Sequence, residues 1–163
     1  MPATYEPIAT TTLSSAAASI SFSSISSAYT DLRLVMTYTC STSSYAYVRI
    51  NSDTGTNYSR TQISGDGSTA TSIRGTSQDK MVPPVGATTT TPVMYTADFF
   101  SYAGSTNKTS LWTGSSDFNG SGTVGRQVYL WRSTSAISSL QITSNAGNFE
   151  IGTTATLYGI LKA

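Results

Sequence analysis

Carboxylates are the side chains of this 163-residue chain that could most simply do catalytic chemistry. Two of them at a fixed separation could hydrolyse a glycosidic bond. Three of the eight, Asp53, Asp66 and Asp117, stand beside glycine or serine in segments typical of turns, where an aspartate usually caps the backbone. We therefore expect no enzymatic activity and no catalytic residue among the eight, which are Glu6, Asp31, Asp53, Asp66, Asp79, Asp98, Asp117 and Glu150.

Other catalytic and cofactor chemistry lacks the residues it needs. The chain has no histidine and a single cysteine, Cys40, which excludes histidine-based triads and the common zinc sites. Residues 51–57 offer oxygen ligands but fail the EF-hand pattern, so a plain turn is favoured over a calcium site. Residues 120–125, "GSGTVG", lead into strand-like sequence rather than the helix that a phosphate site uses, and they predict a hairpin loop. We expect neither a metal nor a cofactor.

Composition narrows the class of partner. Charged residues make up 10% of the chain, the net charge is +1, and the nine Lys and Arg residues are scattered singly. Such scattered charges do not form the basic patch that a nucleic-acid-binding surface requires. No apolar stretch approaches the 18 residues that a membrane span requires. Ten Tyr, five Phe and two Trp argue against disorder.

Apolar residues alternate with polar ones, which is the period of a β-strand. Residues 31–40 place Leu32, Leu34, Met36, Tyr38 and Cys40 on one face, which predicts a half-buried strand with Cys40 as a small buried residue. Residues 45–51 alternate in the same way. The four residues between these two segments suit a hairpin loop.

The remaining segments complete an all-β fold. Further strands are expected at 5–13, 18–22, 92–103, 124–134, 139–144, 148–152 and 154–163. Residues 65–84 predict a long, partly irregular connection, and only 24–30 could hold a helical turn. We therefore expect an antiparallel β-sandwich or jelly roll of about eight to ten strands, with one domain over 1–163.

The last strand and the tryptophan before it are expected to be buried. Leu157 and Ile160 belong to a segment that must pair within a sheet, most simply in its own subunit. Gly152 and Gly159 suit a bulge or a close backbone approach. Trp131 is expected to face the core.

Four residues are candidates for contact with a partner. Tyr45 and Tyr47 share a strand face with Arg49, and Tyr158 lies on the C-terminal strand. Tyrosine and arginine on a surface of low charge are typical of protein interfaces and of glycan-binding platforms.

Three blocks of sequence also resemble a known type of protein: residues 5–36, "YEPIATTTLSSAAASISFSSISSAYTDLRLVM", residues 49–59, "RINSDTGTNYS", and residues 148–160, "NFEIGTTATLYGI". Their order resembles small Ser/Thr-rich structural proteins and fibre modules of tailed phages, especially phages of cyanobacteria and marine bacteria. The resemblance implies a role on the exterior surface of the virion and provides no catalytic residues.

Within a virion, the absence of a heptad segment and of a fixed repeat favours a compact module. A capsid decoration or cement protein fits best, bound to other virion proteins such as the major capsid protein. Such proteins typically form homotrimers, and a trimer is expected here. The alternatives are a tail or neck fibre module that binds a host surface glycan and an enzyme acting on polysaccharide.

Overall fold

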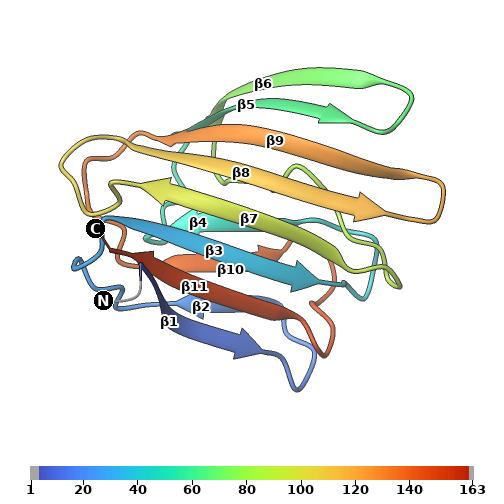
Figure 1. Ribbon diagram of the computed structural model, residues 1–163, viewed down its shortest axis with the longest axis horizontal. Helices are drawn as coiled ribbons and strands as arrows, with labels where there is room; N and C mark the ends of the chain where they lie inside the picture. Colours follow the sequence, from blue (N-terminus) through green and yellow to red (C-terminus); the bar gives the residue numbers. More distant parts are fainter. Residues whose placement is uncertain (1–3, 162–163) are drawn as a thin grey trace.

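The computed structural model describes residues 4–161, which form eleven β-strands and no helix (Figure 1). The strands are β1 Tyr5–Thr12, β2 Ser19–Phe22, β3 Asp31–Tyr38, β4 Ala46–Ile50, β5 Tyr58–Gly65, β6 Ala70–Gln78, β7 Val93–Phe100, β8 Lys108–Asp117, β9 Gly122–Trp131, β10 Leu140–Ser144 and β11 Thr154–Ile160.

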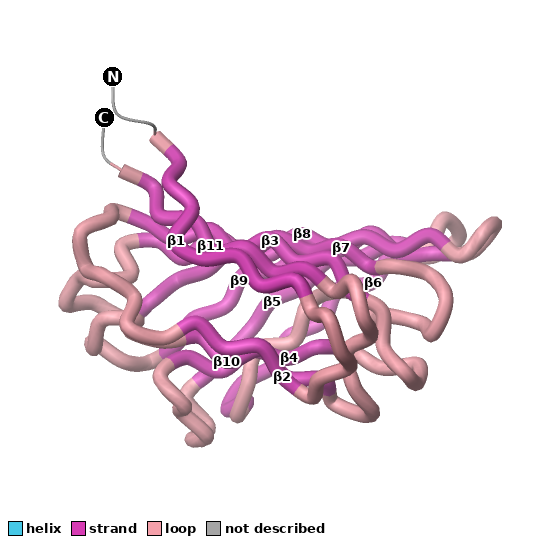
Figure 2. Tube along the Cα trace, turned by 90° about the horizontal axis from the view of Figure 1, so that it is seen from below, coloured by secondary structure: helices cyan, strands magenta, loops and turns pink. Residues whose placement is uncertain are grey.

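The strands form two antiparallel sheets of unequal width. The large sheet has eight strands in the order β1-β11-β3-β7-β8-β9-β5-β6, and the small sheet has three in the order β2-β10-β4. Figure 2 shows the small sheet lying beneath the large one. The prediction of an all-β sandwich is thus confirmed, with eleven strands instead of eight to ten.

Aromatic side chains fill the space between the sheets. Trp112 on β8 stacks on Tyr95 of β7 with ring centroids 5.5 Å apart, and it meets Phe99 and Tyr129 edge-on at 6.0 and 5.7 Å. All four rings are buried, because the period of two sends alternate residues of each strand inward. The tyrosine hydroxyls reach polar partners: Tyr129 donates to the Val82 carbonyl at 3.1 Å.

A loop completes the lower layer where the small sheet ends. Met81 and Ala87 form isolated bridges to Val48 and Ser44, which extend the small sheet beyond β4. Pro84 packs beneath Gly125 of β9, where a Cβ atom would lie 2.6 Å from the Cβ of Pro84. The expected irregular connection over 65–84 is therefore wrong for β6 and right for the residues that follow it.

The sequence also misplaced some strand partners and boundaries. The expected β3–β4 hairpin does not form: β3 pairs with β11 and β7 in the large sheet, whereas β4 pairs with β10 in the small one. Residues 108–117, not recognised as a strand, form β8. Residues 148–152 make only isolated bridges through Phe149, because this short segment crosses between the sheets. Residues 24–30 contain a turn and no helix.

The prediction that the last strand pairs within a sheet is confirmed, with Leu157 buried and Ile160 half-buried. Residues 162–163 of that expected strand lie outside the described residues. β11 lies inside the large sheet between β1 and β3, and Gly159 packs against the ring of Tyr29, where no Cβ would fit. Trp131 and Cys40 are buried, and burial raises the pKa of the Cys40 thiol. Residues 120–125 lie at the β8–β9 hairpin, as expected.

Candidate functional site

The small sheet carries three of the four candidate contact residues. Tyr47 and Arg49 lie on the outward face of β4, and Tyr45 directly precedes the strand. All three are half-buried. Arg49 pairs with Asp79 (Nη2 to Oδ2, 2.7 Å), and its guanidinium lies 5.0 Å from the centre of the Tyr47 ring. The Lys80 ammonium lies 4.7 Å from the same centre.

These contacts occupy the groups that would meet a ligand. Two cations of the chain itself already stack on the Tyr47 ring, and a carboxylate of the chain already binds Arg49. The cluster therefore works as an internal clamp between β4 and the residues that follow β6. Its aromatic surface is only partly available to a partner.

The fourth candidate, Tyr158, lies elsewhere. It sits on β11 and points to the outer face of the large sheet, the face turned away from the small sheet. The four candidate residues consequently do not form one site. Instead, Tyr158 belongs to a cluster that sequence analysis missed.

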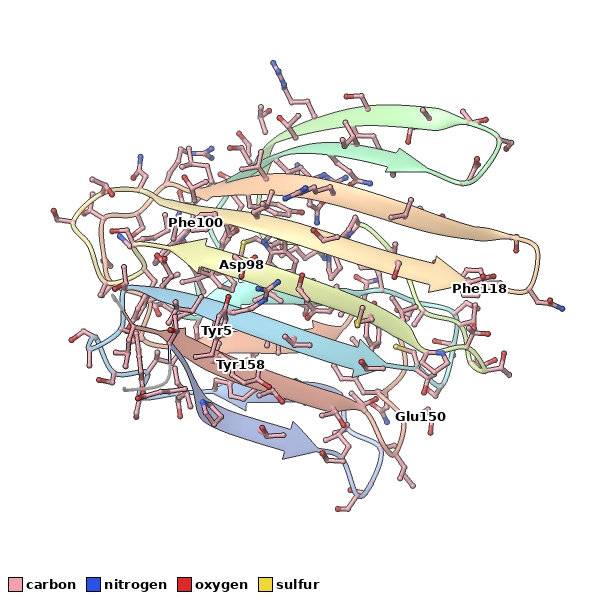
Figure 3. The ribbon with its side chains drawn as sticks, in the orientation of Figure 1. Tyr5, Asp98, Phe100, Phe118, Glu150 and Tyr158 are labelled. Carbon is pink, nitrogen blue, oxygen red and sulfur yellow. The ribbon has the colours of Figure 1, made fainter. Side chains whose placement is uncertain are left out.

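This second group, the tyrosine cluster, consists of Tyr5, Arg33, Asp98 and Tyr158. Figure 3 shows Tyr5 and Tyr158 beside each other, and their rings meet edge-on with centroids 6.5 Å apart. Arg33 donates to the Tyr5 hydroxyl at 3.3 Å and lies 3.4 Å from the Asp98 carboxylate. The register of β1, β11, β3 and β7 aligns these residues across the sheet.

Burial shapes the electrostatics of this cluster. Partial burial raises the pKa of Asp98, Arg33 and Arg126 oppose that rise, and the charge of Asp31 adds to it. Asp31 itself accepts a hydrogen bond from the backbone N–H of Ser101 at 2.6 Å. The Asp98 and Asp31 carboxylates thus each have a partner within the protein. The cluster presents the phenol rings of Tyr5 and Tyr158 beside the Arg33–Asp98 ion pair.

The other half of the outer face is hollowed. Three adjoining hollows of about 640, 210 and 320 Å³ run along β5 and β9, and together they form what we call the outer groove. The first shares Ile63 and Arg126 with the second, which shares Thr61 and Val128 with the third. The residues lining these three hollows include Arg74 and Arg126 and no carboxylate.

Apolar side chains stand exposed on this outer face. Six of them have between 41% and 61% of their surface exposed, although each lies on a strand of the sheet: Tyr5, Ile63, Met94, Phe100, Val124 and Val128. One signal was available in the sequence, because the alternation in β9 sets Val124, Arg126 and Val128 opposite the buried Gln127 and Tyr129. The alternation did not predict β5, β6 or β8, however, and the groove could not be predicted without these strands.

The turn carboxylates bind the chain's own donors. Asp53 accepts from the indole N–H of Trp131 (2.7 Å), the backbone N–H of Gly55 (2.8 Å) and the amide of Asn57. Burial alone would raise the pKa of Asp53, but these hydrogen bonds outweigh it and lower that pKa. Asp66 and Asp117 accept backbone N–H groups in the same way. Within residues 4–161, no three His, Cys, Asp or Glu side chains gather as a metal site would require.

Two further results concern membranes and relatives. The described part of the chain contains no helix with the length and apolar character needed to cross a membrane. Comparison of the chain with protein-family models, with curated proteins and with solved structures found no match.

Proposed function

We propose that this protein is a non-enzymatic module on the exterior of a tailed-phage virion, most closely a capsid decoration or cement protein. The single observation that carries the proposal is the exposed apolar outer face of the large sheet. A sheet face that bears Ile63, Val124 and Val128 in the open, with few charges, is suited to bind another protein surface. The phage assignment is supported by the sequence resemblance.

In this proposal, the outer face is the contact surface for neighbouring virion proteins such as the major capsid protein. Apolar and aromatic side chains contribute most of the binding energy when a partner excludes water from them. A nearly neutral surface lets many copies lie side by side with little repulsion. The homotrimer implied by the resemblance remains a prediction. Half of the ten tyrosines are not available to a trimer interface, because Tyr38, Tyr58, Tyr95, Tyr102 and Tyr129 all lie in the protein's own core.

The first test is the copy number of the protein in purified virions, measured by quantitative mass spectrometry against the major capsid protein. Hundreds of copies would support decoration of the capsid lattice. A few to some tens would support a location on the tail, neck or fibres. Complete absence from clean particles would contradict the virion role.

A second test addresses the contact surface. Val124→Glu places a charge in the outer groove and should abolish binding of the added protein to particles that lack it. Ile151→Glu is the matched control, because Ile151 is 67% exposed and lies in a turn outside the outer face. If both variants bind like the natural protein, the outer face is not the contact surface.

The tyrosine cluster favours one alternative, a fibre module that binds a host surface glycan. Two phenol rings beside Arg33 and Asp98 combine a stacking surface with groups that bind sugar hydroxyls. Binding of the isolated protein to host envelopes, lost in Tyr158→Ala and retained in Tyr47→Ala, would support this alternative. Absence of binding to envelopes would exclude it.

A further inference from the structure

The two edges of the large sheet differ in how they are closed. β1 carries Pro7, which lacks a backbone N–H, and its register with β11 shifts between Pro7 and Ala9. Both features discourage a further strand from pairing there. β6, at the other edge, has nine residues, no proline and one charged residue, Arg74. Figure 1 shows β6 as the outermost element at the top of the sheet.

The unpaired side of β6 can be assigned residue by residue. Asp66 donates its backbone N–H to the Thr69 carbonyl at 3.3 Å, and Gly65 pairs with Ala70. Since bonded and non-bonded pairs alternate in an antiparallel ladder, Ser72 and Arg74 direct their N–H and C=O groups away from β5. Within residues 4–161, β6 forms ladder pairs with β5 alone. A row of unpaired backbone groups is complementary to one kind of occupant, another β-strand.

We propose that this occupant is β6 of a second copy, paired antiparallel about a two-fold axis through Ile73. A two-fold axis makes one surface serve both partners, so the closed β1 edge is not needed. In this register Ile73 faces Ile73 of the other copy, and each Arg74 faces a Ser72, so that no like charges are opposed. An axis through Arg74 would oppose two arginines.

The pairing also uses side chains that the monomer leaves exposed. Ile73 is 43% exposed and occupies the register position opposite the buried Gln62. In the dimer, the two Ile73 side chains cover each other as a cross-strand pair. The two large sheets join into one continuous sheet, and the outer faces of both copies remain open. The paired edge is distinct from the outer face, so this dimer does not depend on a role in a virion.

The test compares two variants of the full chain by sedimentation equilibrium. Ser72→Pro removes a backbone N–H that points away from β5, so it should leave the fold intact and weaken dimerisation at least about tenfold. Ser72→Ala keeps that N–H and should dimerise like the natural protein. A natural protein that remains monomeric at about 100 micromolar, well above the Kd of a micromolar homodimer, would overturn the proposal. A dimer that Ser72→Pro leaves unchanged would overturn it too. A trimer, which the sequence resemblance implies instead, would overturn it as well.

Cysteine cross-linking tests the register. Ile73→Cys should form a disulfide-linked dimer on mild oxidation, because a non-bonded antiparallel pair brings the two side chains close. Ile63→Cys lies on β5 and is more exposed than Ile73 (61% against 43%), so it should remain uncross-linked although a probe reaches it more easily. The natural Cys40 is buried. Equal cross-linking of both variants would contradict the proposed axis. These outcomes are independent of virion copy number, so the two proposals can fail separately.

Discussion

The inner and outer faces of the large sheet are built by the same strands but serve opposite purposes. On β8, Trp112 points inward and is fully buried among three aromatic rings, whereas its neighbour Leu111 points outward and borders the outer groove. Both side chains are apolar, so hydropathy alone does not separate them. The difference lies in what covers each face: the small sheet and the 81–87 loop cover one, and no described residue packs over the other.

This contrast separates stability from recognition. Substitutions on the inner face should lower the free energy of unfolding, whereas substitutions on the outer face should change association and leave folding intact.

Trp112→Ala should have the largest effect. It removes the ring on which Tyr95, Phe99 and Tyr129 pack and leaves a cavity, so we expect the free energy of unfolding to fall by about 3–5 kcal/mol. Urea denaturation followed by tyrosine fluorescence or circular dichroism measures the change. The control is Leu111→Ala, expected to cost less than about 1 kcal/mol. Equal losses in both variants would show that the outer face is covered too.

Gly125→Ala tests how closely the 81–87 loop packs under the sheet. The added Cβ would lie 2.6 Å from the Cβ of Pro84, so backbone must shift, and overpacking of this kind costs about 1–3 kcal/mol. Thermal unfolding should show a lower Tm. At Gly65 the nearest atom to an added Cβ is the Thr69 carbonyl oxygen at 3.8 Å, so Gly65→Ala should leave the Tm nearly unchanged. An unchanged Tm for Gly125→Ala would mean that the loop does not press on β9.

Asp53→Asn should give a smaller effect that depends on pH. The amide cannot accept all the hydrogen bonds from Trp131, Gly55 and Asn57, so we expect a loss of about 1–2 kcal/mol at neutral pH. Folding lowers the pKa of Asp53, so its contribution is present above the ordinary pKa of aspartate and disappears as the pH falls through the folded-state value. In denaturation curves recorded at a series of pH values, the stability difference between the two proteins should be largest at pH 7 and should shrink as the pH falls. A gap that persists at low pH would mean that the charge of Asp53 is not responsible.

Val124→Thr should have the smallest effect on folding. Val124 is 61% exposed on the outer face, so the free energy of unfolding should change by less than about 0.5 kcal/mol. Binding to a partner at the outer groove should nevertheless weaken, which a pull-down from disrupted virions can measure. A large loss of stability would show that the outer groove belongs to the fold and not to an interface.

Individual strands show which features of the fold could be predicted from the sequence and which could not. The alternation in β3 and β9 correctly predicted which side chains face the core, including Trp131. The same alternation could not reveal that β3 and β4 lie in opposite sheets, because a four-residue connection fits a hairpin and a crossing between layers equally well. β6, with nearly every residue exposed, lacks the apolar alternation that marks a strand, and its strand conformation depends on pairing with β5.

For the candidate contact residues too, some features could be predicted from the sequence and others depended on tertiary contacts. Residue type drew attention to Tyr47, Arg49 and Tyr158, and the structure places all three side chains on outward faces of their strands. Which of them are free could not be predicted, since Asp79 and Lys80 reach Arg49 and Tyr47 from a distant segment. Tyr5 and Asp98 join Tyr158 only because β1, β11, β3 and β7 align in register.

By itself, the sequence determined the strand class of this protein, the inward set of its clearest strands and the lack of histidine chemistry, because each of these depends on local periodicity or on residue type. Tertiary structure alone decided the order of the strands, the unequal width of the sheets, the open β6 edge and the exposed outer face. The physical reason is that alternation specifies two faces for every strand, whereas the packing of distant segments decides which face is buried and which edge is paired.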